Sequence, residues 1–100
     1  MINHTVLFKL KEFVSEDQKG AIRSKIAHEL LALKEKVEVL KYIQVGMNYE
    51  LNTSSFDICL VTHFETLNDL DIYRVHPDHL KVFELIKANT VNRAAVDFEF

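Results

Sequence analysis

The feature that most constrains the fold is a two-residue alternation of apolar and polar side chains near both ends of the chain. Residues 2–11 read INHTVLFKLK, and residues 94–100 read AAVDFEF. Successive side chains of a β-strand point to opposite faces of a sheet, so this alternation predicts strands with one face toward a core. Residues 39–49 and 56–64 alternate in the same way. The sequence therefore predicts four strands.

A helix is predicted between the first two strands. Ser15 is a suitable N-cap, and Gln18 follows at the spacing of a capping box. Apolar residues then recur every three or four positions, as one face of a helix requires. They are Ile22, Ile26, Leu30, Leu33 and Val37. This stripe predicts a helix from about residue 16 to residue 36.

A second helical region follows the third strand and is predicted to be broken in two. The first piece covers residues 67–73, with Leu67, Leu70 and Ile72 expected to point inward. Pro77 suits the first turn of a new helix because it needs no backbone N–H there. Three residues are expected to face inward from this second helix: Leu80, Phe83 and Ile86.

The order of these elements predicts the fold class. A short polar turn, ELNTSS at residues 50–55, joins the second and third strands as an antiparallel hairpin. The chain then reads β-α-β-β-α-β, which is the ferredoxin-like α+β arrangement of a four-stranded antiparallel sheet with helices on one face. A chain of 100 residues has the length of one domain, so we expect a single domain over residues 1–100.

The two faces of the predicted sheet differ in their partners. The more apolar face is expected to take the helices, and it is assigned Phe8, Ile58, Leu60, Phe64, Phe98 and Phe100. The other face is assigned Leu7, Tyr42, Gln44, Cys59, Val61, His63 and Asp97. An amphipathic face with several apolar residues is often covered by another subunit. Two such sheets can face each other across a two-fold axis, which predicts a homodimeric α/β barrel. The alternative is a monomer with a few exposed apolar residues.

Composition excludes several classes of protein. The net charge is −3 and no run of Lys or Arg occurs, which argues against a nucleic-acid surface. No stretch approaches the roughly 20 apolar residues of a membrane span, and the alternating N-terminal segment lacks the apolar core of a secretory signal. Cys59 is the only cysteine, so no internal disulfide is possible. We expect a cytoplasmic protein without a membrane or nucleic-acid partner.

A tyrosine and two histidines gather in YRVHPDHL, which spans residues 73–80. Tyr73 and His79 lie at the predicted helix break, where they can overhang the sheet face that carries His4. In a partly apolar pocket, a histidine can hold a pKa near neutrality and move a proton. A tyrosine can hydrogen-bond a carbonyl oxygen and stabilise an enolate-like charge. We predict His79 as general base, Tyr73 as carbonyl partner and His4 as support, with no metal or organic cofactor.

Structural roles are an open alternative for the same side chains. His4 can be an ordinary strand histidine, and His76 can mark the helix boundary before Pro77. Tyr73 and His79 can pair and hold the helix break. No metal site is predicted, because His76 precedes the helix and so does not share a helical face with His79.

Taken together, the quoted segments resemble the Dabb family, the stress-responsive dimeric α/β-barrel domains. The resemblance covers nearly the whole chain, through INHTVLFKLK, VLKYIQVGMNYE, SSFDICLVTHFET, DIYRVHPDHL and RAAVDFEF. Its specificity lies in a combination of features: an early strand histidine, Val-Gly-Asn-like residues after the first helix, the Tyr-x-x-His-Pro-x-His segment and a terminal Asp-Phe. The resemblance implies a homodimer in which two four-stranded sheets form a barrel with the helices outside.

The resemblance also bears on function. A plant relative, olivetolic acid cyclase, closes a linear polyketide by an intramolecular aldol reaction, and His4, Tyr73 and His79 match polar residues of its pocket. A further pocket histidine of that enzyme is Ile58 here. We expect a pocket between sheet and helices that binds a small, partly apolar molecule, with Phe8, Ile58, Phe83 and His76 as ligand-binding residues. The alternatives are a cyclase-like or isomerase-like acid–base enzyme, and a dimer whose pocket is filled by its own side chains.

Overall fold

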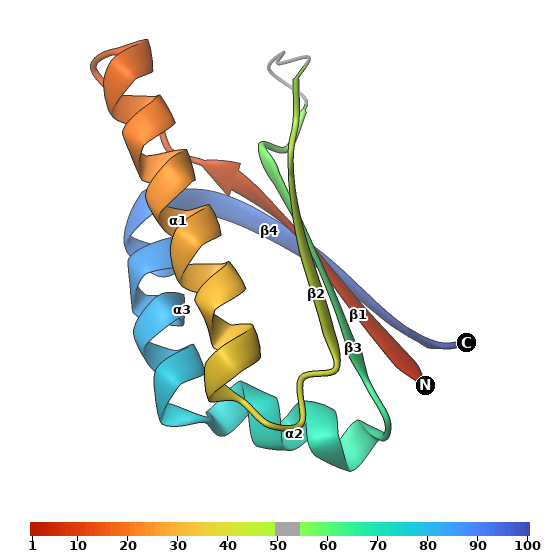
Figure 1. Ribbon diagram of the computed structural model, residues 1–100. Coiled ribbons are helices and arrows are strands. Elements are labelled where there is room, and N and C mark those ends of the chain that lie inside the picture. The colour runs from red at the N-terminus through yellow and green to blue at the C-terminus, as the bar shows by residue number, and fades with distance from the viewer. Residues whose placement is uncertain (50–54) are drawn as a thin grey trace.

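The chain folds into one antiparallel sheet with its helices on one side (Figure 1). The structure is a computed structural model that describes residues 1–49 and 55–100. The elements in chain order are β1 (Ile2–Leu10), α1 (Glu16–Lys36), β2 (Tyr42–Met47), β3 (Ile58–Phe64), α2 (Leu67–Val75), α3 (Pro77–Asn89) and β4 (Thr90–Glu99). The strand order is β2-β3-β1-β4. The predicted ferredoxin-like fold is confirmed. Apart from Ser55, the predicted turn at residues 50–55 lies outside the described residues.

Helix α1 has the bounds that its apolar stripe predicts. The Ser15 hydroxyl accepts a hydrogen bond from the backbone N–H of Gln18 at 3.1 Å and so satisfies one of the free donors of the first turn. Ile26, Leu30 and Leu33 are buried against the sheet. The helix therefore follows from local sequence signals and is fixed by the burial of one face.

The predicted break between α2 and α3 is confirmed. The Thr66 hydroxyl caps α2 by accepting from the backbone N–H of Asp69 at 3.1 Å. Helix α2 ends at Val75, and Pro77 opens α3. His76 connects the two helices, and its Nδ1 accepts from the backbone N–H of Asp78 at 3.1 Å. His76 is thus the N-cap of α3.

Three residues expected to point inward from these helices do not. Leu67 is 62% exposed, and Ile72 and Leu80 are exposed as well. In α2 the buried residues are Leu70 and Tyr73, which are one turn apart and share a face. In α3 they are Val82, Ile86 and Asn89. The prediction was wrong because short helices contain too few apolar residues to define the direction of the stripe.

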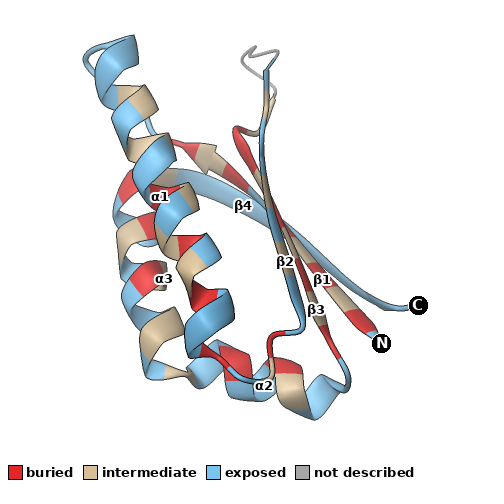
Figure 2. Cartoon of the chain, in the orientation of Figure 1, coloured by how far each residue is buried: buried red, intermediate tan, exposed pale blue. Residues whose placement is uncertain are grey.

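The core lies between the helices and the two central strands, as Figure 2 shows by the buried residues of β1 and β3. Alternate residues of these strands are buried on the helix side, which is the face that the alternation predicted. They are Ile2, His4, Val6, Phe8, Leu10, Ile58, Leu60, Thr62 and Phe64. The central strands thus carry the sheet's share of the core.

The side chains of β4 point to the opposite faces of the sheet from those predicted, and the strand begins at Thr90 rather than Ala94. In its pairing with β1, Asp97 lies opposite His4. Paired residues of adjacent strands point to the same face, so Asp97 lies on the helix side while Phe98 and Phe100 lie on the open side. Phe98 is 48% and Phe100 57% exposed. The assignment failed because both faces of this sheet are apolar. Hydrophobicity alone therefore does not determine the phase of an edge strand, that is, which alternate residues point to which face.

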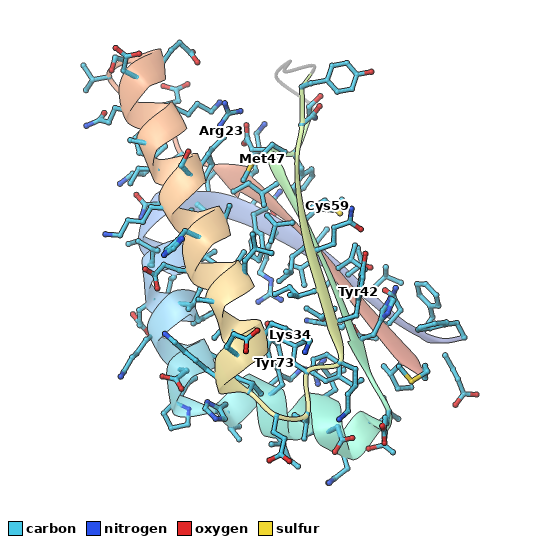
Figure 3. The ribbon with its side chains drawn as sticks, viewed as in Figure 1. Arg23, Lys34, Tyr42, Met47, Cys59 and Tyr73 are labelled. Atoms are coloured by element: carbon cyan, nitrogen blue, oxygen red, sulfur yellow. The ribbon has the colours of Figure 1, made fainter. Side chains whose placement is uncertain are left out.

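The face of the sheet turned away from the helices is here called the open face. Figure 3 shows Tyr42 and Cys59 on this side of the strands. Apolar and aromatic side chains from all four strands gather on it. They are Leu7, Tyr42, Cys59, Val61, Val96 and Phe98, with Phe100 directly after β4. The open face is therefore more apolar than the sequence alone suggested.

Candidate functional site

A cavity of about 190 Å³ lies between the helix side of the sheet and the helices. Most of its wall is apolar and comes from β1, α1, β3 and α3. The apolar residues include Val6, Phe8, Leu30, Leu60, Val82 and Ile86. Its polar lining consists of His4, Tyr73, Arg74, His79 and Arg93. Such a combination of apolar wall and few polar groups is typical of small-molecule sites.

Tyr73 is the most buried polar side chain of the cavity, with 0% of its surface exposed. It lies on the buried face of α2 (Figure 3), and its ring packs on Phe64 and His79 with centroid distances of 5.0 and 4.4 Å. Its hydroxyl has no hydrogen-bond partner among the described residues. Burial raises the pKa of Tyr73, so the phenol keeps its proton and remains a donor.

His79 has a defined proton position because of the helix break. Its Nδ1 lies 3.0 Å from the carbonyl oxygen of Arg74, near the end of α2. The usual partner of that carbonyl, the backbone N–H of Asp78, is instead bound to His76. Since a carbonyl oxygen only accepts, Nδ1 of His79 carries the proton and donates it. Nε2 therefore keeps its lone pair in the neutral ring.

The surroundings of His79 favour this neutral form. Burial lowers the pKa of His79, and the nearby charges of His4, Arg93 and His76 act in the same direction. The hydrogen bond to the Arg74 carbonyl partly opposes these effects. At neutral pH the ring can accept a proton at Nε2, as a general base must.

His4 is held by a carboxylate. Its Nδ1 is hydrogen-bonded to Oδ1 of Asp97 on the neighbouring strand. The other oxygen of Asp97 accepts from Nη2 of Arg74 at 3.0 Å. Because the carboxylate accepts, Nδ1 of His4 carries a proton, and the ring orientation is fixed by two strands and a helix.

The structure brings five of the seven predicted site residues to one cavity: His4, Phe8, Tyr73, His79 and Phe83. Ile58 is buried in the core and does not line this cavity. His76 also lies outside the lining and caps α3. The roles predicted for these residues stay predictions.

Sequence reasoning missed three charged residues of this region, Arg74, Arg93 and Asp97. Arg74 stands beside Tyr73 in the motif, and its position at the end of a helix was the available signal. Arg93 and Asp97 are separated by an even number of positions, so they share a face of β4. The correct phase of β4 would have placed both on the helix side.

The cavity does not coincide with a cluster of metal ligands. In residues 1–49 and 55–100, no three His, Cys, Asp or Glu side chains are arranged to hold a metal ion. The chemistry that these residues can supply is proton transfer at His79, hydrogen-bond donation from Tyr73, and positive charge from two guanidinium groups. This set suits a ligand with acceptor oxygens on an apolar body.

The chain matches the model of a known protein family. A family model named Dabb, described as Stress responsive A/B Barrel Domain, matches residues 2–100. The chain belongs to the Dabb family. The predicted family is thus confirmed over almost the whole sequence, and no protein of curated function matches this Dabb chain.

Solved structures share the Dabb fold described above. A dimeric protein of unknown function and ferredoxin-like fold from Bacteroides fragilis is 32% identical, with a TM-score of 0.87 over 99% of this chain and 95% of that one. A dimeric ferredoxin-like protein of unknown function from Thermobifida fusca is 25% identical, with a TM-score of 0.79 over 99% and 90%. A hydroxynitrile lyase from Passiflora edulis is 14% identical, with a TM-score of 0.76 over 97% and 90%. At that identity the lyase shows the fold alone.

Within residues 1–49 and 55–100, no helix of the Dabb chain combines the length and apolar character that a bilayer span requires.

Proposed function

We propose that this Dabb protein binds a small, partly apolar molecule in the cavity between its sheet and its helices. The observation that carries the proposal is the Tyr73 hydroxyl, which is fully buried in the cavity lining without a partner among the described residues. Leaving such a group unpaired costs about 1–3 kcal/mol. A ligand oxygen in the cavity would accept its hydrogen bond and remove this cost.

The volume of the cavity limits the size of the ligand. Sites for drug-sized molecules are typically about 300–1,000 Å³, whereas this cavity holds about 190 Å³. An apolar cavity of roughly 150 Å³ accommodates benzene. We therefore propose a ligand with one ring or one short branched chain, together with a polar substituent.

A second candidate function is acid–base catalysis without a cofactor, of a cyclase-like or isomerase-like kind. The observation that favours it is the fixed tautomer of His79, whose Nε2 is available as a base in the cavity wall. Nε2 would remove a proton from the carbon beside a carbonyl group, and Tyr73 would donate to the enolate oxygen. In an isomerisation, the protonated Nε2 would return the proton to another carbon conjugated with the enolate. In a cyclisation, the enolate carbon would attack a second carbonyl group, whose oxygen would take the proton. His4, held by Asp97, would support the polar end of the substrate.

We also propose that two copies pair through their open faces into a barrel. The open face exposes Leu7, Val96, Phe98 and Phe100, and such a patch is unfavourable in water. The Bacteroides and Thermobifida relatives are both described as dimeric. A two-fold pairing would cover the same surface on each copy.

Binding of acetophenone, a single ring with one carbonyl oxygen, tests the first proposal. Isothermal titration should detect binding to the wild type. The Tyr73→Phe variant should bind about five- to tenfold more weakly, because one hydrogen bond of about 1–1.5 kcal/mol is lost. Tyr49→Phe is the matched control, since Tyr49 is exposed and outside the cavity lining. If the wild type bound none of acetophenone, phenylacetate and phenylacetamide, the proposed function would be contradicted. Equal binding of acetophenone by Tyr73→Phe and the wild type would contradict the role of the hydroxyl.

A further inference from the structure

We infer that the ligand of this cavity is a small apolar carboxylate, and that Arg93 is the residue that binds its carboxylate group. This inference rests on the proposed binding function and adds the chemical class of the ligand. It depends on the charges of the lining, on the partners of each charge, and on the position of Arg93.

The charges in the cavity lining have one sign. Among the described residues, the cavity lining includes two arginines, Arg74 and Arg93, and no Asp or Glu. The remaining polar groups of the wall are Tyr73, His4 and His79. Tyr73 is a donor, so the strong hydrogen-bonding groups of the wall favour an acceptor, and the net charge favours an anion.

The two arginines differ in whether a carboxylate of the protein already pairs with their charge. Arg74 contacts Asp97 at 3.0 Å and Asp71 at 3.3 Å. For Arg93, no described residue provides a salt bridge or a hydrogen bond to the guanidinium; the backbone N–H of Arg93 donates to the side-chain oxygen of Asn92. Arg74 is therefore committed to holding Asp97 and hence His4. Arg93 is the guanidinium available to a ligand.

The strand register places Arg93 on the helix side of the sheet, where the cavity lies. It lies opposite Phe8 in the β1–β4 pairing, and Phe8 is buried on the helix side. Arg93 is exposed but also lines the cavity, so it marks where the cavity opens to solvent. Its charge reaches His79, whose pKa it helps to lower. The guanidinium and the proposed base thus lie near the same space.

These positions define how the ligand would lie. The apolar body would pack against Val6, Leu30 and Leu60 in the interior, and the carboxylate would stay at the opening beside Arg93. A guanidinium can donate two parallel hydrogen bonds to a carboxylate, which selects this group over a neutral amide of the same shape. An aromatic monocarboxylate such as phenylacetate has the required size and polarity.

Phenylacetate and phenylacetamide are matched probes, because they differ mainly in charge. Isothermal titration of the wild type should give about five- to tenfold tighter binding of phenylacetate, as expected for a partly exposed charge-assisted bond. Arg93→Gln should remove this preference. Arg23→Gln should retain it, since Arg23 lies on α1 outside the lining (Figure 3). Raising the salt to about 1 M should reduce the preference, because exposed charges are then screened.

The outcomes separate the two proposals. If both probes bind the wild type equally, the carboxylate inference is wrong while the binding site stands. If Arg93→Gln keeps the full preference for phenylacetate and its circular dichroism is unchanged, Arg93 is not the anion-binding residue. If neither these probes nor acetophenone bind the wild type, the proposed binding function itself fails.

Discussion

The two faces of the sheet are both apolar, but the chain's own helices cover only one of them. On the helix side, the apolar residues of β1 and β3 are buried by the protein's own helices, and the cavity left there contains histidines with defined hydrogen bonds. On the open face, Phe98 and Phe100 remain about half exposed. One face thus concentrates polar groups suited to a ligand, while the other offers area for a second copy. The same alternation along a strand can serve chemistry on one face and assembly on the other.

The largest effect is expected from placing a charge on the open face. In a barrel, Phe98→Lys would bury an unpaired ammonium group at a cost of several kcal/mol, so the dimer dissociation constant should rise roughly a thousandfold or more. Light scattering after size exclusion should then show monomers. Val14→Lys is the control, because Val14 is almost fully exposed in the loop between β1 and α1.

Monomeric wild type at micromolar concentration would contradict pairing through the open face. So would a Phe98→Lys variant that stays dimeric. Since Phe98 is already exposed in the single chain, circular dichroism of the variant should remain that of the wild type.

The next-largest effect is expected from replacing His79, the proposed general base on the helix side of the sheet. If His79 is a general base, the wild type should accelerate exchange of the acetophenone methyl protons for deuterium in heavy water. His79→Gln should lower this rate about a hundredfold, the low end of what a general base contributes. Proton NMR measures the exchange, and His28→Gln is the control because His28 is exposed on α1. An unchanged rate in His79→Gln would eliminate the base assignment.

A smaller effect is expected from pH. The folded-state pKa of His79 lies below its ordinary value of about 6.5, so between these two pKa values the unfolded chain binds more protons. The contribution of His79 to stability is therefore fully present above about pH 6.5 and is lost as the pH falls through the folded-state pKa. Thermal unfolding should show a smaller loss of Tm on acidification in His79→Gln than in the wild type. Parallel losses in both proteins would contradict the proposed environment of His79.

Much of the fold was predictable because its signals are local. The Ser15 cap, the apolar stripe of α1 and the break at His76 each depend on a few neighbouring residues, and the structure has all three. The gathering of Tyr73 and His79 followed from the same break. Local periodicity thus fixed the elements and their order.

The phase of β4 was not predictable from periodicity. Alternation shows that Asp97 and Phe98 point to opposite faces, but only the pairing with β1 determines which one meets the helices. The error also hid Arg93 and the contact between Asp97 and His4. Two apolar faces remove the contrast on which the assignment depends.

The composition of the cavity wall was predictable only in part. Phe8 and Phe83 line it, whereas Ile58 packs in the core beside it. Sequence gives the face on which a side chain lies but not its depth, because depth depends on how the helices cross the sheet. A cavity is what packing leaves unfilled, and no local pattern encodes it.

Strand β4 has a consequence for any coupling between the two faces. It is an edge strand, and along it Val96 and Phe98 alternate with Asp97. These side chains share one backbone, so any displacement of β4 by a partner on the aromatic side would also move the carboxylate that orients His4. A ligand bound near Arg93 would in turn restrict the motion of β4, from which the aromatic rings project. The affinity for a ligand and the affinity for a second subunit would then be thermodynamically linked through β4.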